Sequence, residues 1–160
     1  MKTLLLVIDL QKAFINEHTK NLPNKIKDII DKEKYDKVAF TRFINRIDSV
    51  YVKKLEYKKC INEEDKEIVI DVGKNKIIDK YVYTAVNKEL IEYINENEIE
   101  EIYLCGLDTD ACVLKTALDL FELGYNIYVL KDYCACTSGI EIHNNALEIL
   151  SRNIGKEYVI

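Results

Sequence analysis

The chain has 160 residues, of which 48% are hydrophobic and 32% charged, a balance typical of one globular domain, which we place at 1–160. The formal net charge is -5 and the basic residues form no stripe, which argues against a nucleic-acid partner. The five cysteines are odd in number and lack the paired spacing of a secreted disulfide framework, which favours a reduced, cytoplasmic setting.

The N-terminal apolar run from Thr3 to Asp9 predicts a strand buried on both faces of a parallel sheet, with Asp9 at its C-terminal end. This run is too short for a membrane span, and it ends at an acid without the small-residue cleavage site of a secretory signal. After Leu22-Pro23-Asn24, the spacing of the isoleucines predicts a helix over about 24–33. Residues 37–43 read as the second strand. Residues 44–66 have weak periodicity, so we expect a loop with at most one helical turn there.

The rest of the chain alternates between short apolar runs and amphipathic stretches. The short runs predict strands at 67–72, 76–80, 101–106, 126–130 and 157–160. The amphipathic stretches predict helices at 87–97, 110–123 and 139–153. This alternation indicates an α/β fold, a three-layer α/β/α sandwich around a central, mostly parallel sheet of the doubly wound kind.

Three reactive side chains fall at the ends of predicted strands or just after them, where open α/β sheets bind their ligands. They are Asp9, Lys80 and Cys112. A thiolate is a nucleophile, a carboxylate can take and return its proton, and an ammonium stabilises the negative charges between them. Cys112 also falls in the first turn of a predicted helix, whose N-terminus favours the thiolate and whose N–H groups offer an oxyanion hole.

Each of these residues also has an ordinary structural interpretation. A cysteine at the start of an amphipathic helix is commonly a small buried hydrophobe. An acid at a strand end is often a cap or turn former, and a lysine there is usually solvated. Taken one at a time, these interpretations are favoured. They weaken when the residues are taken together, because the three side chains follow three separate strands.

Three blocks of the sequence resemble the isochorismatase-like cysteine hydrolases, the superfamily of nicotinamidases and N-carbamoylsarcosine amidases. The blocks are Leu6-Val-Ile-Asp-Leu-Gln-Lys-Ala-Phe14, Lys80-Tyr-Val-Tyr-Thr-Ala85 and Gly106-Leu-Asp-Thr-Asp-Ala-Cys-Val-Leu-Lys-Thr-Ala117. They occur in the family's order, and the resemblance continues through 131–136 and 143–147 to cover nearly the full length. It implies the family's α/β fold and its hydrolase chemistry.

The resemblance also implies how the site is built. Asp9, Lys80 and Cys112 match the family's catalytic triad, with Cys112 forming a thioester intermediate. The family's non-proline cis peptide bond falls here at Leu107–Asp108. It would turn the Asp108 N–H toward the substrate beside that of Cys112, and we expect these two backbone groups to form the oxyanion hole.

The region after the second strand departs from the nicotinamidases, which usually carry an Asp-x-His-x-x-His metal site there. This chain reads Thr41-Arg-Phe-Ile-Asn-Arg-Ile-Asp48, without a histidine. We therefore expect no metal and no cofactor, and nicotinamide is not the favoured substrate. Arg42 either binds a substrate carboxylate or pairs with a surface acid. Phe14 and Tyr83 are expected at the substrate pocket, as is Tyr133.

Three further residues are assigned to structure rather than chemistry. Cys134 and Cys136 are expected to be buried thiols rather than a redox pair, and His143 to cap or pack the last helix. Because many members of the superfamily are oligomers, the resemblance implies a homo-oligomer, a dimer or a tetramer.

The leading hypothesis is a metal-independent cysteine hydrolase that cleaves an amide or related C–N bond of a small molecule. One alternative is an isochorismatase-type hydrolase of a vinyl ether, and another is a catalytically idle binding module on the same scaffold. Retention of Asp9, Lys80 and Cys112 argues against the idle module. A dinucleotide-binding protein fits the fold class, but Asp9-Leu-Gln11 stands where its glycine-rich turn is required.

Overall fold

The structure, a computed structural model, describes residues 1–32 and 34–160. In this part of the chain, five parallel strands form one sheet in the order β3-β2-β1-β4-β5. The strands are β1 (Thr3–Ile8), β2 (Lys37–Phe43), β3 (Lys76–Lys80), β4 (Glu101–Leu107) and β5 (Asn126–Ala135). The strand order reverses direction around β1, so β1 and β4 flank the position where such sheets bind ligands at their carboxyl edge.

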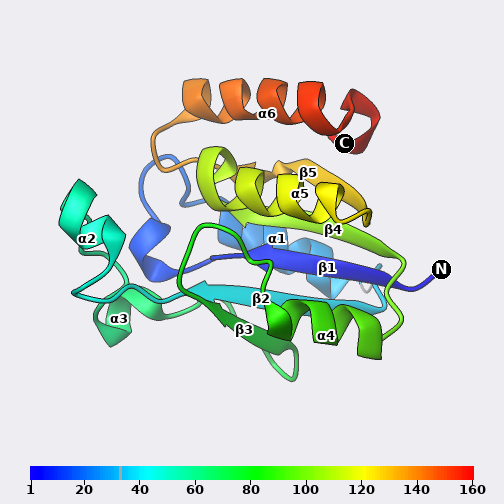
Figure 1. Ribbon diagram of the computed structural model, residues 1–160, viewed down its shortest axis with the longest axis horizontal. Coiled ribbons are helices and arrows are strands. Elements are labelled where there is room, and N and C mark those ends of the chain that lie inside the picture. Colours follow the sequence, from blue (N-terminus) through cyan, green and yellow to red (C-terminus); the bar gives the residue numbers. More distant parts are fainter. Residues whose placement is uncertain (33) are drawn as a thin grey trace.

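Helices cover both faces of the sheet, as expected for a three-layer sandwich (Figure 1). On one face, α1 (Leu22–Asp31) buries Ile26 and Ile29 against Leu5 and Val7 of β1. The opposite face carries three helices: α4 (Lys88–Glu96), α5 (Leu114–Glu122) and α6 (Ile140–Ile154). Successive side chains of β1 point to opposite faces and all six residues except Thr3 are buried, which explains the unbroken apolar run in the sequence.

Most of the expected elements are present with small shifts at their ends. The helix expected at 24–33 is α1, which begins at Leu22 with Pro23 in its first turn; the expected end at Glu33 lies outside the described residues. The helix α4 is capped by Asn87, whose side chain accepts from the Leu90 N–H. The strand expected at 126–130 extends to Ala135. Beyond a register shift it still pairs with β4, and the polar residues of 131–133 concealed this continuation.

Two expected strands are absent from the described residues. Residues 67–72 contribute only an isolated antiparallel bridge between Gln11 and Ile68, and their apolar side chains pack beside the α1 face of the sheet. At the C-terminus, Lys156–Tyr158 form the short 3-10 helix η3, and only Val159 bridges to Val129. The apolar residues of both segments cover the core. Composition alone does not distinguish such a covering segment from a strand that pairs in the sheet.

The segment 44–66 is more ordered than the sequence indicated. It contains α2 (Val50–Leu55) and α3 (Glu63–Lys66), which lie beyond the carboxyl ends of the strands, at the left of Figure 1. The Ser49 side chain accepts from the Val52 N–H, and the Asn62 side chain accepts from the Asp65 N–H. These N-caps stabilise two helices too short to show a hydrophobic period. A third short element, the 3-10 helix η1 (Lys12–Phe14), follows β1.

The connection from β4 to α5 is made by a π-helical turn, η2 (Thr109–Val113), so Cys112 lies in this turn rather than in the first turn of an α-helix. Gly106 makes the approach possible. Its φ is +119°, and a Cβ atom there would lie 2.1 Å from the carbonyl oxygen of Ile8. Only glycine allows β1 and β4 to pass this closely just before the turn.

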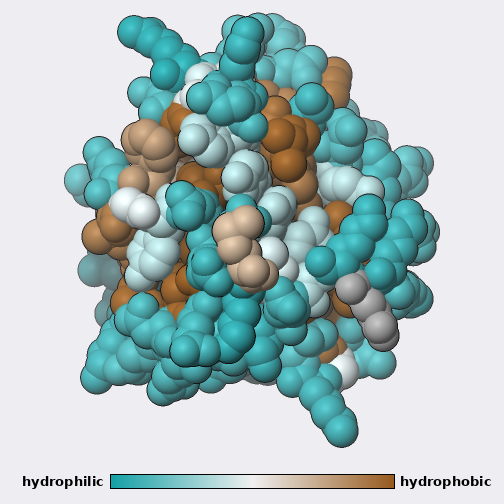
Figure 2. Space-filling model, turned by 90° about the vertical axis from the view of Figure 1, so that its right-hand side faces the viewer, coloured by the Kyte–Doolittle hydropathy of each residue, from teal (hydrophilic) through white to brown (hydrophobic). Residues whose placement is uncertain are grey.

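None of the helices in the described residues is both long and apolar enough to cross a membrane. Figure 2 shows the end of the molecule at which the strands begin. Hydrophilic residues cover most of this face, with smaller hydrophobic areas between them.

Candidate active site

Asp9 follows β1 directly and is fully buried at the carboxyl edge of the sheet. Its backbone adopts a positive φ of 46°, a conformation that aspartate tolerates better than most residues. The Thr41 hydroxyl donates to Asp9 Oδ1 at 2.6 Å, and the Asp9 N–H donates to the same hydroxyl at 3.1 Å. Among the described residues, the polar partner of Oδ2 is the Lys80 ammonium, with which it forms an ion pair.

Lys80 is the last residue of β3, and its side chain is 1% exposed. Its Nζ lies 2.7 Å from Asp9 Oδ2 and 3.4 Å from Cys112 Sγ, and it donates to the carbonyl oxygens of Val82 and Tyr83 at 2.9 and 3.0 Å. Burial lowers the pKa of Lys80, but the carboxylate and the thiol beside it more than offset this, so the pKa is raised above 10.5. The ammonium therefore stays charged and contacts both the Asp9 carboxylate and the Cys112 thiol.

Cys112 is 9% exposed, and its thiol completes the group. Burial raises the pKa of Cys112 well above its usual value, and the Asp9 carboxylate raises it further, against the opposing effect of Lys80. The expectation that a helix N-terminus favours a resting thiolate is therefore wrong for this site. Desolvation and a neighbouring negative charge dominate, so the resting form is a thiol next to a potential base.

A cavity of about 190 Å³ opens onto the thiol. Its walls are mostly aromatic and apolar, and they are formed by Phe14, Phe43, Tyr51, Leu55, Tyr57, Tyr83, Leu107, Asp108, Ala111, Cys112 and Thr137. Phe14 and Tyr83 thus lie where the sequence predicted them. Tyr133 packs with the core on the α1 face instead and does not line this cavity.

Arg42 does not lie at the cavity, which corrects the expectation of a substrate-binding role. Its Nε and a terminal nitrogen donate to the two oxygens of Asp79 at 2.7 and 3.0 Å. Side chains alternate along β2, so Thr41 and Phe43 face the site while Arg42 points to the other side. The guanidinium is therefore engaged in a bidentate ion pair with Asp79 on the neighbouring strand β3 rather than free to bind a substrate.

Asp108 precedes η2, the turn that carries Cys112, and the peptide bond between Leu107 and Asp108 is cis. Its carboxylate accepts from the Thr137 N–H at 3.0 Å and from the Thr137 hydroxyl at 2.5 Å. Burial raises the pKa of Asp108, and these hydrogen bonds oppose the rise. Its backbone carbonyl accepts from the N–H groups of Ala111 and Val113. The backbone of Asp108 is therefore bonded to the turn that follows it, and its carboxylate is bonded to Thr137 beyond β5.

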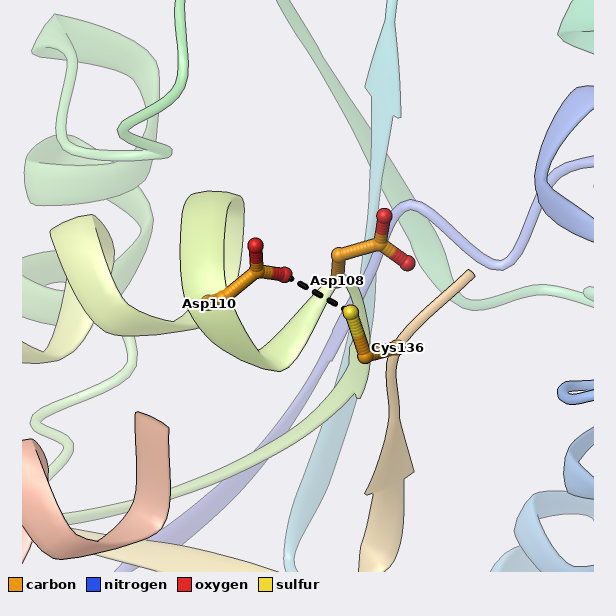
Figure 3. A group of neighbouring side chains, drawn as sticks. All are labelled: Asp108, Asp110 and Cys136. Carbon is orange, nitrogen blue, oxygen red and sulfur yellow. Dashed lines mark hydrogen bonds between the residues drawn. The ribbon is translucent and has the colours of Figure 1, made fainter. Parts of the chain in front are cut away.

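Asp108, Asp110 and Cys136 are the described residues outside the triad whose side chains could act together as metal ligands, with ligand atoms within 4.8 Å of one another (Figure 3). Their hydrogen bonds do not suit a metal centre. Asp108 is engaged by Thr137, and Cys136 Sγ donates to Asp110 at 3.0 Å. Burial and the Asp110 carboxylate raise the pKa of Cys136 to about 12, so its sulfur is a protonated thiol and a poor ligand.

Comparison with known proteins identifies the family of this chain. A sequence profile of the isochorismatase domain matches residues 3–156, and the chain belongs to the isochorismatase family. Isochorismatase family protein 1A of Dictyostelium discoideum is 24% identical over 135 residues, covering 81% of this chain. The chain spans 61% of that relative's length, and 29% and 60% of family proteins 2A and 1B of the same organism.

Solved structures share the whole fold. The nicotinamidase of Bacillus subtilis superposes with a TM-score of 0.84 at 26% identity, and the match covers 100% of both chains. The N-carbamoylsarcosine amidase of Thermoplasma acidophilum superposes with a TM-score of 0.79 at 24% identity, over 97% of this chain and 94% of the other. The chain is therefore an isochorismatase-family hydrolase with the α/β fold and central parallel sheet that the sequence predicted, although only five of the seven expected strands join the sheet in the described residues.

Sequence reasoning missed residues that shape the site. Tyr51 and Tyr57 line the cavity from the segment 44–66, where weak periodicity gave no element to place them on. Thr41 holds the Asp9 carboxylate. A hydroxyl that follows the apolar pair Ala39 and Phe40 was a usable signal for it, since a buried hydroxyl requires a partner.

Proposed function

We propose that this protein is a cysteine hydrolase that cleaves an amide or related C–N bond of a small molecule through a thioester on Cys112. One observation carries the proposal: Lys80 lies 2.7 Å from Asp9 and 3.4 Å from Cys112, and Cys112 lines a cavity. An acid–base group, a cation and a nucleophile from three separate elements thus meet where a small molecule can enter.

The reaction begins from the protonated thiol. Asp9 takes the proton of Cys112 as the sulfur attacks the carbonyl carbon, forming a tetrahedral oxyanion. The intermediate collapses by breaking the C–N bond, and the leaving amine takes the proton from Asp9. Water then attacks the thioester while Asp9 takes its proton. Collapse of the second intermediate releases the carboxylic acid, and the proton returns from Asp9 to the Cys112 sulfur.

Two features support this sequence of proton transfers. Apart from the Lys80 ammonium at 2.7 Å, Asp9 Oδ2 has no polar partner among the described residues, so a lone pair is available for the proton of the thiol. The Lys80 ammonium compensates the negative charge, whether it lies on the carboxylate or on the sulfur. The backbone N–H groups of Asp108 and Cys112 are proposed as the oxyanion hole, since both residues line the cavity.

The cavity walls favour a small substrate with an apolar or aromatic body. The volume of about 190 Å³ and the aromatic side chains leave little room for a charged or extended molecule. We propose that hydrolysis needs no metal, because the two histidines of the chain, His18 and His143, line a different cavity. Treatment with a chelator should leave the rate unchanged; a loss restored by Zn²⁺ would overturn this part of the proposal.

The central test combines an amide library with intact-mass measurement. We expect a substrate to leave a covalent acyl adduct on the wild-type protein, and expect the adduct and the turnover to vanish in Cys112→Ala. The mass of the adduct would identify the acyl group. Hydrolysis that persists in a folded Cys112→Ala variant would refute the thioester mechanism, as would turnover of a vinyl ether without any acyl adduct.

A further inference from the structure

The side chain of His143 lies behind the nucleophile turn rather than in front of it. It comes from α6, is 8% exposed, and its Nδ1 is 2.7 Å from the hydroxyl of Thr109. Thr109 is fully buried and is the first residue of η2, the turn that carries Cys112. The catalytic chemistry proposed above makes no use of this hydrogen bond.

The direction of the hydrogen bond follows from a third group. Thr109 Oγ1 also lies 3.0 Å from the carbonyl oxygen of Ala135, which can only accept. The single hydroxyl proton of Thr109 is therefore donated to Ala135, and the Thr109 oxygen accepts from His143 Nδ1–H. Burial lowers the pKa of His143, so its ring is neutral at neutral pH with the proton on Nδ1.

These hydrogen bonds fix the start of the turn to two other elements. Thr109 is joined to α6 through His143 and to the end of β5 through Ala135. The preceding residue, Asp108, is held by Thr137. Cys112 lies three residues further along the same turn, whose N–H groups at 111 and 113 both bond the carbonyl oxygen of Asp108. A displacement of Thr109 would therefore move the thiol relative to Lys80.

His143 is separated from the reacting atoms. It lines a second cavity, of about 420 Å³, together with Lys25, Lys131 and Asp132. None of the residues around this second cavity lines the one that opens onto Cys112. His143 therefore has no path to a substrate held at the thiol, and an acid–base role for it does not fit the structure.

We propose that His143 is a positioning residue, whose Nδ1–H holds Thr109 and thereby sets the Cys112 thiol against Lys80. This inference rests on the proposed function of Cys112. Its consequences are nonetheless measurable without a substrate, because alkylation of the thiol by iodoacetamide depends on the same placement and environment of the sulfur.

The test uses two pairs of variants that differ in one property. Thr109→Val removes the hydroxyl and keeps the shape, whereas Thr109→Ser keeps the hydroxyl. His143→Asn places an amide N–H near the position of Nδ1, whereas His143→Gln carries the same amide one carbon too far. The rate of iodoacetamide labelling is followed by intact mass at pH 7, with Cys112→Ala giving the labelling of the other thiols. Circular dichroism and the thermal midpoint select the variants that are folded.

We expect the labelling rate to change about tenfold in Thr109→Val and in His143→Gln, and to stay within about twofold of wild type in Thr109→Ser and His143→Asn. The double variant Thr109→Val/His143→Gln should match Thr109→Val, because Thr109→Val already removes the hydrogen bond that His143→Gln breaks. Once a substrate is known, the same two single variants should lower kcat with little change in KM.

Two results would overturn the positioning role. One is a wild-type labelling rate in folded Thr109→Val and His143→Gln. The other is a double variant whose change is the product of the two single changes. If Thr109→Val does not fold, the comparison of His143→Gln with His143→Asn decides the question alone. Failure of the proposed function would look different: Cys112→Ala would keep its hydrolytic activity whatever the labelling rates.

Discussion

The Lys80 ammonium and the Asp9 carboxylate form an ion pair of 2.7 Å in which each side chain is only 1% exposed. Removing two such charges from water is costly, and the pair is tolerated because their other contacts are polar too. Thr41 donates to the carboxylate, and two backbone carbonyls accept from the ammonium. The site is thus preorganised before any substrate enters.

Replacing Lys80 with Met should destabilise the protein by about 3–5 kcal/mol, because the Asp9 carboxylate would be left buried without its counter-charge. The matched control is Lys2→Met, which breaks the Lys2–Glu98 pair, whose side chains are 51% and 77% exposed. That change should have little effect on stability, because solvent screens an exposed pair. Urea unfolding at pH 7 measures both, and equal losses would contradict the assigned role of the buried pair.

Replacing Asp9 with Asn should have opposite effects on two reactions of the same sulfur. Hydrolysis should fall by roughly 10²-fold or more, since the proton acceptor is lost. Labelling of Cys112 by iodoacetamide at pH 7 should become faster. Asp9 raises the pKa of this thiol and Lys80 lowers it, so removing the carboxylate increases the thiolate fraction. Slower labelling in a folded variant would show that Asp9 does not hold the thiol in its protonated form.

The free energy of unfolding should decline as the pH rises above about 8.5. Burial raises the pKa of Cys60 and of Cys134 to about 12, and it also raises the pKa of Cys105. In this window the unfolded chain has lost thiol protons that the folded chain retains, so the folded state is progressively disfavoured. Lys80, whose pKa is raised by folding, adds a loss of the same sign above about pH 10.4.

Each such thiol contributes a slope of about 1.4 kcal/mol per pH unit above its unfolded pKa. Cys134→Ala should therefore give a shallower decline between about pH 8.5 and 10 than wild type, in urea titrations under reducing conditions. Parallel curves would show that this thiol ionises equally well in the folded protein.

Gly106 and Gly73 provide a matched pair for backbone geometry. Gly106→Ala would place a Cβ atom 2.1 Å from the Ile8 carbonyl oxygen and should cost more than about 3 kcal/mol, or prevent folding. Gly73 also has a positive φ, of +56°, but a Cβ atom added there would have no atom within 4 Å, so Gly73→Ala should cost about 1 kcal/mol. Comparable thermal midpoints for the two variants would contradict the close approach of β1 and β4.

The sequence predicted the sheet, its parallel character and the meeting of Asp9, Lys80 and Cys112, because these follow from local apolar runs and from strand ends. It did not predict the π-helical turn around Cys112 or the raised pKa of this thiol. Both depend on tertiary surroundings: the turn is fixed by α6 and β5, and the pKa by burial beside Asp9. No spacing within 106–117 encodes either.

The residues that line the cavity were harder to predict than the group formed by Asp9, Lys80 and Cys112. Tyr51 and Tyr57 belong to a segment whose short helix is stabilised by a cap rather than by a hydrophobic period. Arg42 was misplaced for a different reason. Its position beside the catalytic edge was correct, but the alternation of side chains along β2 turns it toward Asp79 on the neighbouring strand.

The helix α2 and the residues around it supply three walls of the cavity, Tyr51, Leu55 and Tyr57, yet none of the reacting groups. The proposed reacting groups, Asp9, Lys80 and Cys112, are buried on or directly beside the sheet, where substitutions disturb the core. Substitutions confined to this segment could therefore change which substrate fits the cavity, while the proposed reacting groups stay unchanged.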